Sequence, residues 1–253
     1  KVELYTDNGN VILGNGNTGD ITLDVIIDDI NKPLSGKIDI HNYNNLAAGE
    51  KGNDITVSGL LKAKGTINII NDESNIHVLE ASGAEINGSK VTLHAAGSID
   101  NDNNITSGRS VDLQASKSIM NGGNITAATN VVMFTETGSI LNTGNIDAKG
   151  AVTATSGSSI LNLSGEIKAA SDVRLNAKDT LWNLAKVTST NGNAILEADN
   201  RVANTTEYGD YVGKGIVKAA GNVTISTNNN ASTAATLGVY NDADIEAGKD
   251  VTI

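Results

Sequence analysis

The 253-residue sequence has no cysteine, a single proline and an aromatic content of only 3%. The absence of cysteine excludes disulfides and thiolate metal sites, and it fits an exported bacterial protein that must cross membranes unfolded. Because the 39% hydrophobic content comes mostly from Ala, Ile, Val and Leu, we expect a thin and long core. No transmembrane run is present, so we expect no membrane insertion.

Cations are also scarce, since 18 Lys and Arg stand against 29 Asp and Glu and give a formal net charge of −11. Nucleic-acid binding needs clustered cations that displace counterions, and no basic stripe occurs in the sequence. Binding to anionic membranes is disfavoured for the same reason. The composition therefore predicts no nucleic-acid partner.

An asparagine returns every 20 or 21 residues through the middle of the chain, where each one closes a variant of the phrase Gly-Ser-Ile-x-Asn. The six positions are Asn101, Asn121, Asn142, Asn162, Asn183 and Asn204. Two apolar positions recur with the same period. One opens each unit, at Ile86, Ile105, Ile125, Ile146, Ile167 and Val187. The other lies in the middle of the unit, at Val91, Val111, Val131, Val152, Val173 and Ala194. Each unit therefore consists of three short segments.

The middle segments follow the pattern Val-x-Leu-x-Ala at 91–95, 111–115 and 173–177. A period of two indicates a strand with one face inward and one outward. Helical spacing is absent, and Asn-Gly, Gly-Ser and Lys-Gly pairs between the segments supply residues that favour tight turns. The chain is therefore predicted to be all-β.

A unit of this length cannot bury its apolar face alone and must stack on its neighbours. With three strands per coil of about 20 residues, the stack is a parallel β-helix, which strand twist makes right-handed. We expect one solenoid rod over 1–253, cut from a longer protein. Its most regular repeats span 86–204, and irregular or inserted segments lie at 24–53, 205–214 and 228–237.

In such a stack the recurring asparagines lie above one another, where each amide both donates and accepts a hydrogen bond. We interpret the six asparagines as a structural ladder rather than a ligand site. Met120, Leu141, Leu161 and Trp182 form the adjoining column. We expect this column to fill a corner of the core, the alternative being an exposed apolar stripe.

The interruptions contain three of the five tyrosines, namely Tyr43, Tyr208 and Tyr211. After Asn204 the next opening residue is delayed to Ile216, and Val239, Tyr240 and Asn241 resemble one more copy of the phrase. Tyrosine in a loop is a common contact residue, so these three form the candidate binding loops. The alternative is that they pack down as lids over the thin core.

Signals for catalysis or metal binding are weak. Polysaccharide chemistry on a β-helix needs clustered acids over a cleft, whereas the outward positions are mostly Thr, Ser and Asn and their charges do not line up from coil to coil. The run Asp100 to Asn104 lacks the glycine and glutamate of a calcium loop and is interpreted as a polar turn. His41, His77 and His94 share no ligand spacing. No enzyme activity, metal or cofactor is predicted.

The pattern Asn-Ile-Thr-x-x-x-x-Val-x-Leu-x-Ala-x-x-Ser-Ile-x-Asn-x-Gly at 104–123 resembles the repeats of filamentous haemagglutinin-like exoproteins, the secreted partners of two-partner secretion systems. The resemblance covers 86–204. It implies a right-handed β-helix rod on a Gram-negative cell surface, secreted through an outer-membrane transporter. The family's Asn-Pro-Asn secretion motifs are missing. The passenger domain of an autotransporter would form the same kind of stacked coil, so the repeat does not distinguish the two.

These observations predict a secreted cell-surface adhesin or exoprotein whose repeats form a stalk. Host-cell or bacterial surface receptors or glycans would be bound, if at all, by the interrupting loops. Two other functions stay open, a filament that presents a contact-dependent growth inhibition toxin and a β-helix carbohydrate-active enzyme.

Overall fold

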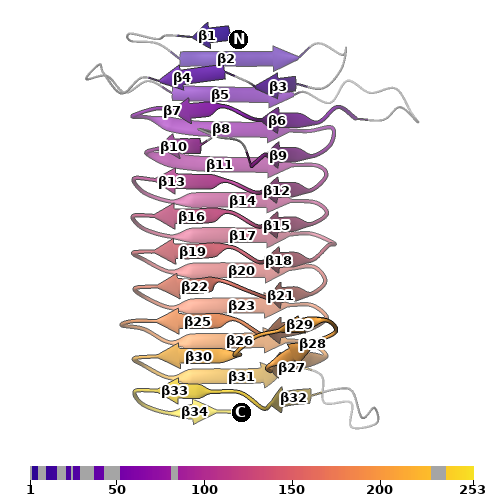
Figure 1. The fold of residues 1–253 in the computed structure, drawn as a ribbon, viewed down its shortest axis with the longest axis vertical. Helices are drawn as coiled ribbons and strands as arrows, with labels where there is room; N and C mark the ends of the chain where they lie inside the picture. Colours follow the sequence, from indigo (N-terminus) through magenta and orange to yellow (C-terminus); the bar gives the residue numbers. More distant parts are fainter. Residues whose placement is uncertain are drawn as a thin grey trace.

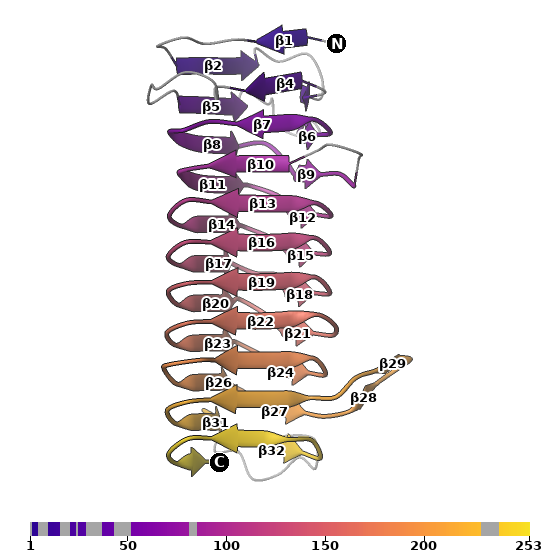
Figure 2. The same cartoon turned by 60° about the vertical axis from the view of Figure 1, so that its left-hand side comes forward.

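The chain forms a right-handed rod of stacked coils, as Figures 1 and 2 show. The computed structural model describes residues 2–4, 10–15, 21–23, 25–28, 37–42, 52–80, 85–228 and 238–253. These residues contain strands and turns and no helix, so the predicted all-β parallel β-helix is confirmed. The first and the last strand lie at opposite ends of the rod (Figure 1).

Three parallel sheets, here named A, B and C, make up the walls. Sheet A contains β1 (Val2–Leu4), β4 (Val25–Asp28), β7 (Leu60–Lys62), β10 (Glu85–Gly88), β13 (Asn104–Ser107), β16 (Asn124–Ala127), β19 (Asn145–Ala148), β22 (Glu166–Ala169), β25 (Lys186–Ser189), β30 (Ile216–Ala219) and β33 (Ile245–Ala247). Sheet B contains β2 (Asn10–Asn15), β5 (Lys37–Asn42), β8 (Thr66–Asn71), β11 (Lys90–Ala95), β14 (Val111–Ala115), β17 (Val131–Thr135), β20 (Val152–Ser156), β23 (Val173–Ala177), β26 (Ala194–Ala198), β31 (Val223–Thr227) and β34 (Val251–Thr252). Sheet C contains β3 (Ile21–Leu23), β6 (Ile55–Val57), β9 (Ile76–Val78), β12 (Ile99–Asn101), β15 (Ile119–Asn121), β18 (Ile140–Asn142), β21 (Ile160–Asn162), β24 (Thr180–Asn183), β27 (Arg201–Asn204) and β32 (Gly238–Asn241).

Equivalent residues of successive coils pair directly, which confirms the repeat register between residues 86 and 204. Ile105 of β13 pairs with Ile125 of β16, and Ile125 pairs in turn with Ile146 of β19. In sheet B, Val111 pairs with Val131 in the same way. All these side chains are at most 1% exposed. The core between β5 and β31 is thus a set of stacked aliphatic columns.

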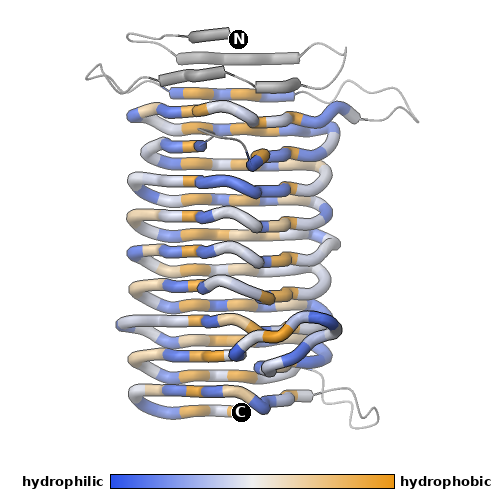
Figure 3. Tube along the Cα trace, viewed as in Figure 1, coloured by the Kyte–Doolittle hydropathy of each residue, from blue (hydrophilic) through white to orange (hydrophobic). Residues whose placement is uncertain are grey.

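Strand alternation produces these columns from short segments. In β14, Val111, Leu113 and Ala115 are buried while the residues between them are partly exposed. Figure 3 shows the resulting alternation of apolar and polar residues along each strand. A fully buried Val, Leu or Ile contributes about 1.5–3 kcal/mol relative to an exposed one, so each coil is stabilised mainly by contacts with the coils above and below.

The six repeated asparagines form one continuous hydrogen-bonded column, here called the amide ladder. From Asn101 onward, each side-chain Nδ2 donates to the Oδ1 of the asparagine in the next coil, at 2.7–2.8 Å. Asn204 continues the series by donating to Asn241 at 2.7 Å. Asn101 to Asn204 are at most 1% exposed, so the ladder satisfies amides that would otherwise be buried without partners.

The turn after a ladder asparagine accepts a second hydrogen bond from the side-chain NH2 group of that asparagine. Asn121 also donates to the carbonyl of Gly123 at 3.2 Å, and Asn142 donates to the carbonyl of Gly144 at 3.0 Å. Gly123, Gly144 and Gly165 stack over one another, and a Cβ on Gly144 would collide with the carbonyl oxygen of Gly123. Glycine is therefore required where the backbone of one turn lies against the next.

The first inward residue of the strand after the first insertion lies one position later than predicted. Val217, not Ile216, pairs with Val187 and is fully buried, while Ile216 pairs with Lys186 and is partly exposed. Because side chains alternate between faces, a shift of one residue exchanges the inward and outward sets. The apolar character of both residues left this register undecided in the sequence.

We predict that Asn142→Asp lowers the free energy of unfolding by about 1–3 kcal/mol, because a buried acceptor would face two other acceptors. Those acceptors are the Oδ1 of Asn162 and the carbonyl of Gly144. Urea unfolding followed by circular dichroism measures the change.

The matched control is Asn145→Asp, three positions along the chain, where the asparagine is exposed. We expect its effect to stay within about 0.5 kcal/mol. Equal denaturant midpoints for Asn142→Asp and the wild type would exclude a stabilising role for the ladder.

Candidate binding face

The outer face of sheet C changes its surface chemistry along the rod. From β12 to β21, each strand of this sheet buries the residues on either side of one outward position. Stacked from β6 to β32, the outward residues are Thr56, His77, Asp100, Met120, Leu141, Leu161, Trp182, Ala203 and Tyr240. One column therefore changes from polar and charged to apolar and then to aromatic.

The apolar part of this column, Met120, Leu141, Leu161 and Trp182, is here called the apolar stripe. The prediction that it fills a corner of the core is wrong. Met120 is 43% exposed and the other three are partly exposed. The amide ladder gives the physical reason, because each ladder asparagine points inward and its neighbour in the strand must then point outward.

Hydroxyl groups run beside the stripe, on the residue that precedes the buried apolar residue of each strand. They belong to Ser98, Ser118, Ser139, Ser159 and Thr180. The hydroxyls of Ser159 and Thr180 are 3.0 Å apart, and Ser98 Oγ accepts from the backbone N–H of Ser118 at 3.3 Å. The face thus presents a row of hydroxyls along a row of apolar side chains.

The insertion at 205–214 forms a hairpin that stands off the rod at the end of β27 (Figure 2). Its strands are β28 (Glu207–Tyr208) and β29 (Tyr211–Val212), which pair antiparallel around a two-residue turn. Gly209 in this turn has a φ of 57°, a left-handed conformation that glycine adopts without strain. The N–H groups of Lys214 and Gly215 donate to the carbonyl of Leu184 and fasten the base of the hairpin to the rod.

One residue beside the hairpin turn, Tyr208, packs against the aromatic end of the stripe. The ring centroids of Tyr208 and Trp182 are 4.5 Å apart, with the planes tilted by 49°. The guanidinium of Arg201 lies 4.7 Å from the Trp182 centroid and 5.5 Å from that of Tyr240. These contacts leave Trp182 partly covered and Ala203 fully buried.

The three candidate binding tyrosines therefore differ. Tyr208 packs down onto Trp182, as the lid alternative expected, while Tyr211 is 52% exposed at the hairpin tip. Tyr43 lies outside the described residues. Val212 is the most exposed large apolar residue described, at 79%, although nothing in the sequence singled it out.

The other end of the column holds a charged cluster that sequence reasoning missed. His77 Nδ1 lies 2.9 Å from a carboxylate oxygen of Asp100, and its Nε2 lies 3.6 Å from one of Asp54. The second oxygen of Asp100 is buried without a hydrogen-bond partner. The three residues follow one another at intervals of 23 positions, outside the 20 or 21 residue period, so the search for equal spacing did not connect them.

The two carboxyl groups of this cluster are shifted in opposite directions. Burial raises the pKa of Asp100 above its usual value, and the neighbouring His77 offsets this only in part. Burial also acts to raise the pKa of Asp54, but hydrogen bonds from Ser74 and Asn75 and the charge of His77 outweigh it and lower the pKa. The ionised form is therefore disfavoured at Asp100 and favoured at Asp54, on the same surface.

Charged residues elsewhere pair across coils more than the sequence predicted. Lys186 lies 3.0 Å from Glu166, and Arg174 lies 2.6 Å from Glu197 on sheet B. Glu166 and Lys186 pair directly between β22 and β25, so the prediction that charges do not line up is wrong there. All four side chains are at least 22% exposed, so the pairs add little stability.

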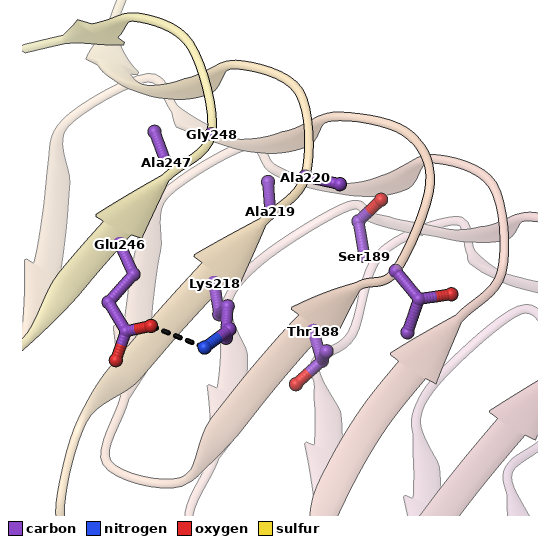
Figure 4. A pocket seen from close by; sticks show the side chains of 9 residues that line it. Thr188, Ser189, Lys218, Ala219, Ala220, Glu246, Ala247 and Gly248 are labelled. Atoms are coloured by element: carbon purple, nitrogen blue, oxygen red, sulfur yellow. Dashed lines mark hydrogen bonds and ion pairs between the residues drawn. The ribbon is translucent and has the colours of Figure 1, made fainter.

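The described surface also carries shallow grooves. Figure 4 shows one of about 410 Å³ on sheet A, lined by Thr188, the small residues of adjoining turns and the Lys218–Glu246 ion pair. A second, of about 570 Å³, includes Asp102 and Asn104 of the segment interpreted as a polar turn. Within the ranges that the structure describes, no group of three or more His, Asp or Glu side chains is arranged to hold a metal ion.

No family model, curated protein or solved structure matches this chain. Across the described residues, no helix has the length and apolar character needed to cross a membrane. The fold alone therefore connects the chain to β-helix repeat proteins.

We predict opposite pH dependences for Asp54→Asn and Asp100→Asn. Asp54 has a lowered folded pKa, so its contribution to stability is present above the unfolded value of 3.8 and disappears as the pH falls through the folded pKa. Asp100 has a raised folded pKa, so its unfavourable contribution is present above that pKa and disappears as the pH falls towards 3.8.

Thermal unfolding between about pH 7 and about pH 3 measures both differences from the wild type. The stability advantage of the wild type over Asp54→Asn should shrink on acidification. The stability of the wild type relative to Asp100→Asn should instead rise. Parallel curves for the two variants would contradict the assigned shifts.

Proposed function

We propose that this chain is a segment of a secreted bacterial exoprotein, in which the β-helix acts as a stalk and the hairpin at 205–214 contacts a surface receptor or glycan. The observation that carries the proposal is the projection of the hairpin from the wall of the described coils (Figure 2). Its tip exposes Tyr211 and Val212 at 52% and 79%. Exposed aromatic residues on a loop held by a rigid scaffold are typical of binding sites.

The rod supports this role mechanically. Coils that contact only their neighbours can be repeated to any length, so a solenoid extends a binding element away from its anchorage. The base of the hairpin is fixed by the carbonyl of Leu184, and Tyr208 beside the turn packs on Trp182, which leaves Tyr211 and Val212 facing outward. Export through an outer-membrane transporter and a position on the cell surface belong to the same proposal.

A filament that presents a contact-dependent growth inhibition toxin would use the same rod with a passive hairpin. A β-helix carbohydrate-active enzyme is the remaining alternative, and the Asp54–His77–Asp100 cluster is the feature that bears on it. Glycoside chemistry needs two carboxyl groups on opposite sides of one bond, whereas both of these carboxylates are bound to one imidazole. The stalk is therefore the better supported function.

We predict that the double substitution Tyr211→Ser and Val212→Ser reduces binding to receptor-bearing cells or to an immobilised glycan panel at least about tenfold, a loss of roughly 1.4 kcal/mol. The melting temperature should stay unchanged because both side chains are exposed. The matched control is Phe134→Ser on the outer face of sheet B, where the ring is 40% exposed. Equal binding by the wild type and the hairpin variant would refute a contact role for the tip.

We also predict that the chain releases no reducing or unsaturated ends from acidic or neutral polysaccharides, with or without calcium. A lyase or hydrolase needs two groups of shifted pKa within reach of one bond, and the paired carboxylates here are occupied by His77. Cleavage that is lost in Asp100→Asn would favour the enzyme instead of the stalk.

A further inference from the structure

One outward residue of sheet C is covered by the chain itself. Ala203 of β27 is 0% exposed, although its position in the sheet is equivalent to that of Trp182 in β24 and of Tyr240 in β32. From β6 to β24, the outward residue of every strand is at least partly exposed. An alanine on the outer face of a sheet is buried only where another part of the chain lies over it.

A side chain and the hairpin together cover the face at this level. The guanidinium of Arg201 lies 4.7 Å from the ring centroid of Trp182 and 5.5 Å from that of Tyr240. Because these two rings stand on either side of β27, the guanidinium lies between them, over Ala203. The ring centroid of Tyr208 lies 4.5 Å from that of Trp182. The hairpin therefore covers the aromatic end of the apolar stripe.

The base of the hairpin is fixed to the rod on both sides. On the entering side, Thr205 is 3% exposed and its N–H donates to the carbonyl of Asn183 at 3.0 Å. On the returning side, the N–H groups of Lys214 and Gly215 donate to the carbonyl of Leu184 at 2.7 and 2.9 Å. The base is therefore a fixed point about which the rest of the hairpin can turn.

A carboxylate of the next coil adds to this fixed base. Asp242 accepts from the N–H of Thr206 at 3.2 Å and from the hydroxyl of Tyr240 at 2.9 Å. The N–H of Gly213 donates to the carbonyl of Thr206 at 2.8 Å and closes the base. The fixed part of the hairpin thus ends at Thr206, directly before β28.

The distal part of the hairpin, residues 207–212, is attached much more weakly. Its strands contain two residues each, and a two-stranded hairpin is marginally stable in water by itself. Within the part of the chain that the structure describes, its one ring contact or hydrogen bond to the rod is that of Tyr208 with Trp182. A Cβ added to Gly209 at the turn would meet no atom within 4 Å, so the turn stands in open space. The closed position therefore depends mainly on one aromatic pair.

We propose that the distal hairpin is a lid, that it turns on the fixed base, and that the packing of Tyr208 on Trp182 holds it closed. When the lid opens, the cover of Trp182 is removed and the apolar stripe is exposed up to its aromatic end. Tyr208 is freed at the same time, beside its strand partner Tyr211. The lid thus controls how much apolar and aromatic surface the rod presents.

The strength of the aromatic pair sets the expected open population. A tilted pair of rings at this separation favours contact by about two- to twelvefold beyond the apolar area that it buries. The contribution of that area is opposed by the ordering of the strand residues of the hairpin. On this basis roughly a tenth of the molecules are open at any time, and loop motions of this kind take nanoseconds to microseconds. This inference does not depend on the adhesive role proposed for the tip.

Thiol labelling measures the opening of the lid, because the chain has no cysteine of its own. Ala203→Cys places a thiol under the lid, and a maleimide should label it in the folded protein. Adding Tyr208→Ser should accelerate the labelling about tenfold, because the lid is then no longer held closed. The control thiol is Ala198→Cys on the core side of β26, which should be labelled only when the rod unfolds. Equal rates with and without Tyr208→Ser, or labelling of Ala203→Cys as slow as that of Ala198→Cys, would overturn the proposal.

Trp182 provides a second measurement that needs no cysteine, because it is the only tryptophan of the chain. Tyr208→Ser should increase the quenching of Trp182 fluorescence by acrylamide and shift the emission to longer wavelength. Tyr211→Ser, at the paired position of β29, is the matched control and should leave both unchanged, because Tyr211 is 52% exposed. Circular dichroism melts confirm that each variant is folded. Equal quenching in the two variants would contradict the closing contact.

Warming of the wild type separates a moving lid from a permanently closed one. Below the melting transition of the rod, the open fraction should grow with temperature, because local opening needs less free energy than global unfolding. The quenching of Trp182 in the wild type should then approach that of Tyr208→Ser. A ratio between the two that stays constant up to the melting transition would refute the motion of the lid.

Discussion

The satisfaction of buried amides is the constraint on which the rest of this structure depends. An asparagine side chain at 0–1% exposure must find partners for its donors and its acceptor, and here the next coil supplies them. A coil that slipped by one residue would place these amides outward and their apolar neighbours inward. The ladder therefore fixes the register of every coil it passes through, and the aliphatic columns follow from that register.

The architecture could be predicted because every coil has the same pattern of inward residues. Ile105, Val111 and Asn121 each return in equivalent places, so the sequence contains both the number of strands per coil and their inward faces. The prediction that Met120 lies in the core is wrong because apolar character alone does not determine the direction of a side chain. The inward asparagine beside it carries that information, and reasoning from Asn121 outward would have put Met120 on the surface.

The candidate site could be predicted only in part, for reasons that lie in the insertions. The sequence located the segment at 205–214 and its tyrosines, but Tyr208 and Tyr211 face different surroundings through the geometry of a two-residue turn. The Asp54–His77–Asp100 cluster depends on coils of unequal length, whose pairing is settled by the whole stack. Long-range contacts between non-repeating residues leave no periodic signal in the sequence.

The amide ladder also gives the rod a direction. Every link from Asn101 to Asn241 runs the same way, with the NH2 group of one asparagine turned towards the C-terminal coil and its oxygen towards the N-terminal coil. The amide dipoles consequently add head to tail along the axis, and each bond polarises the next. Reversal of a single amide would oppose donor to donor on its N-terminal side and acceptor to acceptor on its C-terminal side, so the orientation is set for the column as a whole. The interior of this solenoid is thus electrically oriented, with the positive pole of its hydrogen-bonded column at the C-terminal end.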